Sequence, residues 1–570
     1  MQARSICVPR GGVGVLVGGV LVGGVLVGGV LVGGVLVGGV LVGSCAKTNK
    51  ETTKREKIIK NKFFIFHFCF NNDQLLYIFI ILSFSYNNII KTMKDIIKTM
   101  KEALTYDDVL LVPRRSKVDS RKDVDLSSRL TNDIILNLPI ISAAMDTVTE
   151  NEMAIALARN GGLGIIHRFC SIEDQVAQVL KVKQAENYLI ENPICISPET
   201  SLKEIKEKAE KLNFQTFLVV DENKKLLGLI SKRDYILEDD ENKLAKEIMT
   251  PFEKLVVSYE KITFEEAKEI FRKHKIEKIP IIDKEKRALG LITFRDFQYS
   301  LNKKATRDKK GRLLVGAAIG IRGDYLERAE ELVKAGVDVL CIDVAHGHLE
   351  KCLKAVSEVK KKFPENPLIA GNIATKEGAE DLKNAGADVI KVGIGAGSAC
   401  TTRIVAGVGV PQITAIQEAR KGAGETPIIA DAGCKNSGDI VKALAAGANA
   451  VMLGSLLAGT DEAPGKIFQL NGKKVKLFRG MASATAYQAK KEKIKEESDY
   501  EPTAEGVDYG FVDYKGSVNE ILENLEKGIR SGFSYCGALN LRELWEKAEF
   551  MKITEKGYRE GLPHSIQYWG

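Results

Sequence analysis

No two cysteines in this 570-residue chain have the Cys-x-x-Cys spacing, although the chain contains ten cysteines. This absence argues against a zinc ribbon and against a redox dithiol, which both depend on such pairs. The chain also lacks a basic stripe with interleaved aromatic residues, so nucleic acid is not an expected partner. Its net charge of +8 is modest for this length. Cysteines scattered through a large chain fit a reducing compartment, so we expect a cytoplasmic protein.

The first hundred residues differ from the rest in composition. Residues 18–42 repeat Gly-Gly-Val-Leu-Val, and this uncharged stretch is long enough to cross a bilayer. Its glycine content is far above that of an ordinary spanning helix, and no clear cleavage site is present. A membrane anchor is therefore the less favoured interpretation, and low-complexity sequence ahead of a start at Met93 or Met100 is the favoured one. We treat residues 1–99 as an extension outside the fold.

From about residue 104 the chain alternates strand-like and helical segments. Several of the strand-like runs are continuously apolar, as parallel strands covered on both faces are. Glycine after the helical patterns Tyr325–Lys334, Lys376–Asn384 and Ser437–Ala446 predicts a helix C-cap before the next strand. Eight such units predict an α/β fold, a (β/α)8 TIM barrel made of residues 100–187 and 304–570. A doubly wound sheet is the alternative, but its Gly-x-Gly-x-x-Gly opening turn is missing. We expect the strands at Pro139–Ser142, Leu163–His167, Leu313–Ala317, Val339–Asp343, Leu368–Asn372, Val389–Gly393, Pro427–Asp431 and Ala450–Gly454.

An insertion at residues 188–303, between the second and third strands, contains an internal repeat. Phe217–Asp221 recurs as Ile279–Asp283, and Gly228–Asp234 recurs as Gly290–Asp296, both 62 residues further along. Two copies that share a core form a module of their own.

The repeated segments resemble a pair of CBS domains, a Bateman module, which in other proteins binds adenine nucleotides. The resemblance implies an adenine or guanine nucleotide here, with Ser231/Asp234 and Thr293/Asp296 facing ribose and phosphate. A purely structural pair is the alternative.

A thiol follows the sixth strand on a glycine-rich loop, Gly393-Ile394-Gly395-Ala396-Gly397-Ser398-Ala399-Cys400. Glycines let the backbone approach a ligand or ion closely, and a cysteine presented this way is a candidate nucleophile. Barrel enzymes place their chemistry after the strands, and glycine and serine after the last two strands match a phosphate site. A carboxylate beside that site suits a ribose diol. The pattern predicts a nucleotide held by its phosphate, with a thiolate aimed at its base. The other polar and glycine positions after the strands are Asp343, Asn372, Asp431, Gly433, Gly454 and Ser455.

Several longer motifs resemble the IMP dehydrogenase / GMP reductase family, and the resemblance covers nearly everything from residue 104 to residue 570. They are Leu104–Leu111, Ala144–Glu150, Gly397–Arg403, Gly454–Thr460 and Arg479–Met481. In the dehydrogenases of that family, a thiolate adds to C2 of the purine, hydride passes to NAD, and the covalent thioimidate is hydrolysed to XMP. The resemblance therefore implies NAD-dependent oxidation of IMP in guanine nucleotide biosynthesis.

The resemblance also assigns roles to residues. Cys400 would be the nucleophile, and a relay from Thr402 to Glu505 would activate water. NAD would contact Asp343, Asn372, Gly393, Ile394 and Gly395. IMP would be held by Ser398, Asp431, Ala432, Gly433, Gly454, Ser455, Phe478, Arg479, Gly480, Met481, Ala482 and Glu505.

A monovalent cation such as K⁺ is a further implication, because a bound ion would order a glycine-rich loop that is otherwise costly to fix. The family forms tetramers, so we expect a homotetramer. The cation ligands would be carbonyl groups of Gly395, Gly397 and Cys400, completed by Glu560, Gly561 and Leu562 of a neighbouring subunit.

Departures from the family pattern keep other functions open. Phe478 replaces the usual tyrosine, and Ala432 and Ala482 stand where glycine is usual. The mobile flap, residues 484–510, has no arginine in Ala484–Ala504, although the dehydrogenases use one there to activate water. Lysine is a poor base near neutral pH. The alternative is therefore GMP reductase, which deaminates GMP to IMP with NADPH and which the segment Arg530–Gly537 resembles. The inserted module and the long tail favour the dehydrogenase, and a catalytically inactive nucleotide sensor is the third hypothesis.

Overall fold

The computed structural model divides the chain into two units, Met1–Glu102 and Ala103–Gly570. It describes the backbone of four strands within residues 15–45. It further describes residues 101–185, 189–190, 193–212, 215–259, 262–294, 297–298, 302–494 and 503–563.

The repeated Gly-Gly-Val-Leu-Val sequence forms antiparallel strands in the first unit. The repeat places glycine opposite glycine, as in the pairing of Gly23 with Gly34. The strands lie in the order β1 (Val15–Val17), β2 (Val20–Val27), β3 (Val30–Val37) and β4 (Val40–Cys45). Within the described ranges, every helix is too short or too polar to span a bilayer.

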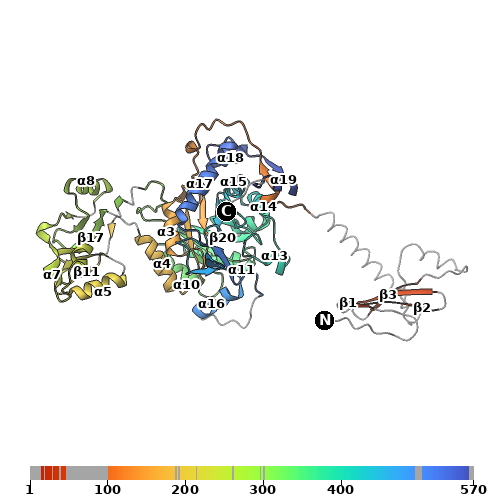
Figure 1. The fold of residues 1–570 in the computed structure, drawn as a ribbon, viewed down its shortest axis with the longest axis horizontal. Helices are drawn as coiled ribbons and strands as arrows, with labels where there is room; N and C mark the ends of the chain where they lie inside the picture. Colours follow the sequence, from red (N-terminus) through yellow and green to blue (C-terminus); the bar gives the residue numbers. More distant parts are fainter. Residues whose placement is uncertain are drawn as a thin grey trace. The chain divides into compact units, whose positions relative to one another are not determined.

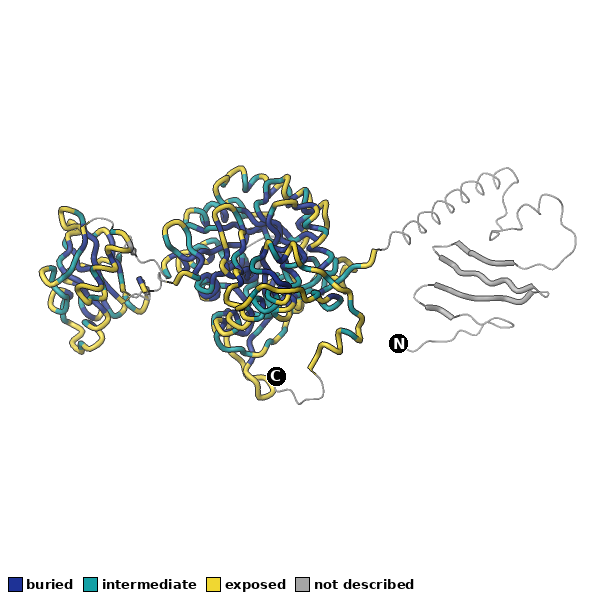
Figure 2. The backbone as a smooth tube through the Cα atoms, turned by 90° about the horizontal axis from the view of Figure 1, so that it is seen from above, coloured by how far each residue is buried: buried dark blue, intermediate teal, exposed yellow. Residues whose placement is uncertain are grey.

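A closed barrel of eight parallel strands forms the centre of the second unit, so the predicted fold class is confirmed (Figure 1). Most residues of its strands are buried, and Figure 2 shows buried residues gathered in the interior of this unit. One prediction is wrong by about three residues: the third strand is Gly316–Ile319 rather than Leu313–Ala317. The ring order is β18 (Gly316–Ile319), β19 (Val339–Asp343), β20 (Leu368–Ile373), β21 (Val389–Val392), β22 (Ile428–Asp431), β23 (Ala450–Leu453), β8 (Ile140–Ser142) and β9 (Leu163–Ile166).

Glycine turns return the chain from the outer helices to the barrel. Gly336, Gly386 and Gly447 have φ angles of +85°, +106° and +118°, a region that favours glycine. The predicted C-caps are therefore confirmed. The three glycines follow α10 (Tyr325–Lys334), α12 (Lys376–Asn384) and α15 (Ser437–Ala445).

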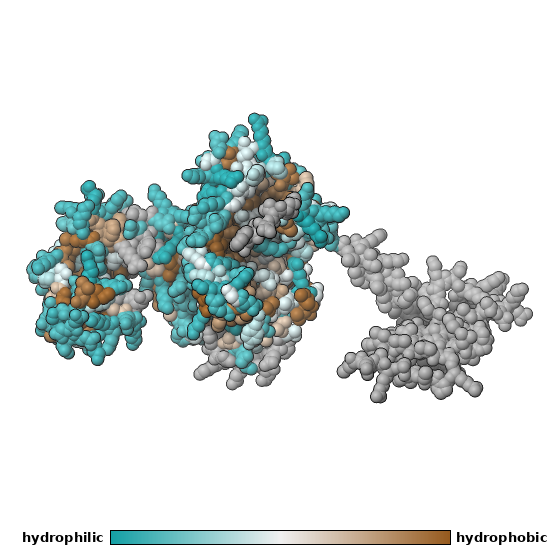
Figure 3. Space-filling view, in the orientation of Figure 1, coloured by the Kyte–Doolittle hydropathy of each residue, from teal (hydrophilic) through white to brown (hydrophobic). Residues whose placement is uncertain are grey.

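The insertion folds as two similar four-stranded sheets. In one copy β12 (Thr216–Val220) pairs with β13 (Leu226–Ser231), and in the other β16 (Lys278–Ile282) pairs with β17 (Ala288–Thr293) in the same register. Leu218 and Leu229 of the first copy pack in one apolar cluster with Ile282 and Leu291 of the second. Because the copies share a core, neither is an independent domain. On the face drawn in Figure 3, the surface of the described residues is mostly hydrophilic, with separate apolar patches.

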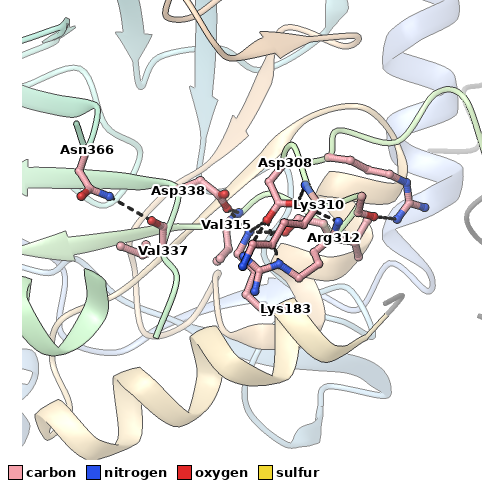
Figure 4. Close-up of polar contacts among 11 residues, drawn as sticks. Lys183, Asp308, Lys310, Arg312, Val315, Val337, Asp338 and Asn366 are labelled. Atoms are coloured by element: carbon pink, nitrogen blue, oxygen red, sulfur yellow. Dashed lines mark hydrogen bonds and ion pairs between the residues drawn. The ribbon is translucent and has the colours of Figure 1, made fainter. Parts of the chain in front are cut away.

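A buried ion cluster lies where the chain re-enters the barrel after the insertion (Figure 4). Lys183, near the end of α4 (Ile172–Gln184), places its ammonium 3.1 Å from a carboxylate oxygen of Asp308 and 2.5 Å from one of Asp338. The Lys183 ammonium also donates to the Leu313 carbonyl over 3.0 Å, and its side chain is 2% exposed. Asp338 accepts a hydrogen bond from the Val315 amide as well. The cluster therefore joins the segment before the insertion to the segment after it.

Replacing Lys183 with Met should lower the free energy of unfolding by about 3–5 kcal/mol, because the poorly solvated Asp338 carboxylate loses its cation, whereas Asp308 keeps its ion pair with Arg312. Chemical denaturation of the full chain measures this loss. Lys334→Met is the control, because that lysine forms exposed ion pairs, which contribute no more than about 1 kcal/mol. Equal stability of the two variants would contradict a structural role for the cluster.

Candidate active site

A cavity of about 1220 Å³ opens at the carboxyl ends of the barrel strands. The barrel collects there the loops that follow most of its strands, as its topology requires. Nearly all of the residues predicted from the sequence line this one cavity. They are Asp343, Asn372, Gly393, Ile394, Gly395, Gly397, Ser398, Cys400, Thr402, Asp431, Ala432, Gly433, Gly454, Ser455, Phe478, Gly480, Met481, Ala482 and Glu505.

Four predicted residues do not line the cavity. Arg479 forms an ion pair with Asp146, with 3.1 Å between its Nε and a carboxylate oxygen, so its guanidinium is engaged within the protein. Glu560, at the end of α19 (Glu555–Glu560), and the following Gly561 and Leu562 are exposed. These last three were predicted to act on a neighbouring subunit, and their exposure is compatible with that prediction.

The Cys400 thiol lies beside a hydroxyl. Its Sγ is 3.2 Å from Oγ1 of Thr402, the first residue of the short helix α13 (Thr402–Val405). The Cys400 amide donates to the Gly397 carbonyl over 3.0 Å, which closes the glycine loop on itself. Cys400 is half-buried and open to the cavity. The loop thus presents the thiol to a ligand instead of packing it in the core.

Glu505 reaches this loop through backbone pairing. The Thr401 amide donates to the Glu505 carbonyl over 2.8 Å, and the Val507 amide donates to the Ala399 carbonyl over 3.0 Å. Gly480 packs against the same pairing: a Cβ there would lie 2.7 Å from the Ala399 carbonyl oxygen. The close approach requires glycine at this position. Cys400, Thr402 and Glu505 are consequently held at one end of the cavity.

A second thiol in the cavity has a different environment. Cys434 follows Gly433 and is buried, and this burial raises the pKa of its thiol to about 12. A thiol with that pKa stays protonated near neutral pH and is a poor nucleophile. The cavity therefore offers two cysteines, of which Cys400 is the one displayed on a glycine loop.

A buried lysine contacts three of the residues that line the cavity, Asp343, Asn372 and Asp431. Lys391 of β21 places its ammonium 2.8 Å from a carboxylate oxygen of Asp343 and 2.8 Å from one of Asp431. It also donates to the side-chain oxygen of Asn372. Burial acts to lower the pKa of Lys391, but the two carboxylates outweigh it and raise that pKa above its ordinary value. The lysine is therefore a permanent cation beneath the cavity.

The turn after β22 carries the substitution noted in the sequence. Ala432 has a φ angle of +78°, where a methyl group costs about 1–2 kcal/mol and glycine costs little. The next residue, Gly433, has a φ angle of +89°, and a Cβ there would lie 3.1 Å from the Tyr106 ring.

A lysine supports the turn after β23 from behind. The Lys515 ammonium donates to the Ser455 carbonyl over 2.6 Å and to the Leu456 carbonyl over 3.2 Å. Residues of both turns line the cavity, and main-chain amides in such turns can hold an anion.

Some lining residues were missed from the sequence. Arg168 and Phe169 follow β9, with the guanidinium 5.1 Å from the ring centroid, and Lys491 comes from α16 (Ala484–Ile494). Arg168 could have been found, because it directly follows a predicted strand. Lys391 was also detectable, as the one charge inside an otherwise apolar strand.

Comparisons with known proteins agree with the fold. A family model described as "IMP dehydrogenase / GMP reductase domain" matches residues 103–564. An inosine-5'-monophosphate dehydrogenase of Nitrosopumilus maritimus is 48% identical over 474 residues, which is 82% of this chain and 99% of that protein. The Aquifex aeolicus dehydrogenase is 50% identical over 482 residues, which is 83% of this chain and 98% of that protein.

Solved structures are also similar. A GMP reductase of Trypanosoma brucei in complex with guanosine 5'-monophosphate has a TM-score of 0.79 and 43% identity, over 82% of this chain and 99% of that chain. A structure of the T. brucei reductase with guanosine 5'-triphosphate has a TM-score of 0.70 and 40% identity, over 81% of this chain and 100% of that chain.

Proposed function

This chain belongs to the IMP dehydrogenase / GMP reductase family, and from that premise we propose that it oxidises IMP to XMP in guanine nucleotide biosynthesis. Relatives named as dehydrogenases are similar over nearly their whole length. The observation that carries the proposal is the Cys400 thiol, 3.2 Å from the Thr402 hydroxyl on a glycine loop at a nucleotide-sized cavity. This arrangement suits covalent catalysis on a purine ring.

The reaction divides into two steps at C2 of the purine. The Cys400 sulfur first forms a bond to C2, and the hydrogen of C2 departs as hydride. NAD, when bound, supplies the acceptor for that hydride. Water then adds to C2 of the resulting thioimidate, the carbon–sulfur bond breaks, and XMP leaves with oxygen at C2. One IMP, one NAD and one water thus give XMP, NADH and a proton, and the thiol is regenerated.

Water activation is the task of Thr402 and Glu505 in this proposal. Both residues line the cavity, and the backbone of Glu505 is fixed beside Thr401. The hydroxyl can pass a proton from water to the carboxylate, as in general-base catalysis. Lys491 also lines the cavity, but an ammonium group only donates hydrogen bonds and has no lone pair with which to accept a proton.

The residues proposed for NAD fit a ribose. Asp343 has 30% of its side chain exposed and lines the cavity with Asn372 and the loop Gly393–Gly395. A carboxylate beside a cavity can accept hydrogen bonds from a ribose diol, and the glycines let a flat ring approach the main chain. On the substrate side, Asp431 occupies the equivalent position, next to the turns at Gly433 and Ser455.

A monovalent cation, K⁺, is proposed at the carbonyl groups of Gly395, Gly397 and Cys400. Gly395 has a φ angle of +79°, and carbonyl oxygens are hard ligands of the kind that suits such ions. An oligomer follows from the proposal, because Glu560, Gly561 and Leu562 of a neighbouring subunit would complete the site, and we propose the homotetramer that the family forms. Exchanging potassium chloride for tetramethylammonium chloride should reduce turnover about tenfold or more, because an unfilled loop loses order. Equal rates in the two salts would argue against the cation.

The inserted module is proposed to bind an adenine or guanine nucleotide. The Asp234 carboxylate accepts from the Ser231 hydroxyl over 2.7 Å at the start of α6 (Lys232–Ile236), and Asp296 lies outside the described residues. Melting temperatures of the full chain with ATP and with GTP test this assignment.

The free cysteines among the described residues also support a cytoplasmic location.

GMP reductase is the second candidate, and two observations favour it. Ala484–Ala504 contains no arginine, and reductases from T. brucei are similar over their whole solved chains. Purified protein is incubated with IMP and NAD, and separately with GMP and NADPH. Formation of NADH supports the dehydrogenase, and consumption of NADPH overturns it in favour of the reductase. Silence in both assays would leave an inactive nucleotide sensor.

Cys400→Ala should reduce turnover by about a thousandfold or more, because the covalent route is lost, while IMP binding stays within about threefold. Cys434→Ala is the matched control, since it removes a protonated thiol from the same cavity and should keep most of the activity. Steady-state rates and calorimetric IMP binding measure both effects. Substantial turnover by the Cys400 variant would rule out the covalent mechanism.

Glu505→Gln should trap the covalent intermediate, because water attack loses its proton acceptor while sulfur attack does not. After mixing with IMP and NAD, the intact mass should show a nucleotide on the peptide that contains Cys400. Lys491→Met is the control and should show no accumulation. Accumulation in the lysine variant alone would assign water activation to the flap instead.

A further inference from the structure

The side chains of alternate residues along the barrel strands point into the barrel. Val339 and Cys341 of β19 pack in the inner apolar cluster with Val389 of β21 and Ile429 of β22. Because side chains alternate along a strand, the next inward position on these strands is Asp343, Lys391 or Asp431. The uppermost interior layer of the barrel is therefore ionic, and it lies directly under the cavity.

Lys391 makes contacts that use all three of its ammonium hydrogens. Its acceptors are Asp343 on β19, Asn372 on β20 and Asp431 on β22, so one side chain touches three other strands. Its own side chain is 2% exposed. A buried cation needs such partners, because its lost hydration must be replaced. The lysine has no access to solvent for chemistry of its own.

Each of the two carboxylates accepts a hydrogen bond from the lysine with one oxygen. Asp343 uses Oδ1, and Asp431 uses Oδ2, which also accepts from the Asn372 amide over 2.9 Å. Both side chains remain partly exposed, at 30% and 17%, and both line the cavity. Each carboxylate thus has its second oxygen available to a ligand hydroxyl. Both carboxylates therefore share one cation.

We propose that Lys391 is a positioning residue that links the cofactor-facing Asp343 to the substrate-facing Asp431, so that a change at one ribose site alters affinity at the other. This inference rests on the proposed function for the identity of the two ligands. Lys391 does not touch the reacting atoms and acts only through the carboxylates. Its effect belongs to ligand affinity and to the coupling between sites.

The test is a double-mutant cycle in which calorimetry measures the affinity of each variant for IMP and for NAD. Asp343→Asn should weaken IMP binding in the absence of cofactor by about threefold or more, although Asp343 faces the cofactor. Asp431→Asn should likewise weaken NAD binding by about threefold or more in the absence of IMP. In the Lys391→Met background, adding Asp343→Asn should leave IMP affinity unchanged. Asp381→Asn is the control, because Asp381 pairs with His348 over 2.8 Å outside the cavity lining.

A merely structural role for Lys391 would give a different result. The single carboxylate variants would then show no cross-effect, or the cross-effect would persist without the lysine, and either result overturns the proposal. If Lys391→Met does not fold, the two single variants still decide whether the sites are coupled, and the absence of a cross-effect in them overturns the proposal. If the wild-type protein consumes GMP and NADPH, the cycle is run with that pair. In that case the proposed function is wrong, and the double-mutant cycle still tests the coupling between the two sites.

Discussion

A closed ring of parallel strands imposes the constraint on which the functional site depends. Closure of β23 on β8 and of β9 on β18 brings every carboxyl end to one mouth. Loops far apart in the sequence, such as those at Asp343 and Asp431, then meet around a single cavity. The loops themselves need little intrinsic order, because the ring fixes where each one starts. The ionic layer below them supplies rigidity that glycine-rich segments lack.

Continuous apolar runs allowed most of the ring to be predicted from the sequence, because parallel strands covered on both faces are apolar along their whole length. The third strand was placed too early because Leu313 and Val315 are as buried as strand residues. They pack in the apolar cluster that also contains Val182 of α4 and Leu332 of α10, and pairing with β9 starts only at Gly316. A hydrophobic pattern in the sequence indicates which residues are buried, but it does not indicate which of them pair with a neighbouring strand.

The candidate site was predictable where function depends on residue type and position after a strand, as at Cys400 and Asp431. It was less predictable where a side chain chooses among several partners. Arg479 belongs to a motif that suggests ligand contact, but Asp146 is its partner in the structure. Lys391 could be recognised as the one charge inside an apolar strand, but the sequence does not show which carboxylates surround it. Such choices are made by distant segments, which a linear pattern does not contain.

The direct pairing of β9 with β18 has a consequence for how this architecture changes over time. These neighbouring strands are separated in sequence by the whole inserted module, yet their ladder is continuous. Residues 188–303 are accordingly an insertion at a point where a short loop would otherwise lead the chain to β18. A lineage could gain or lose this insertion in one genetic event while the hydrogen bonds between the barrel strands stayed in place. An inserted module of this kind can therefore evolve on a different schedule from the ring that carries it.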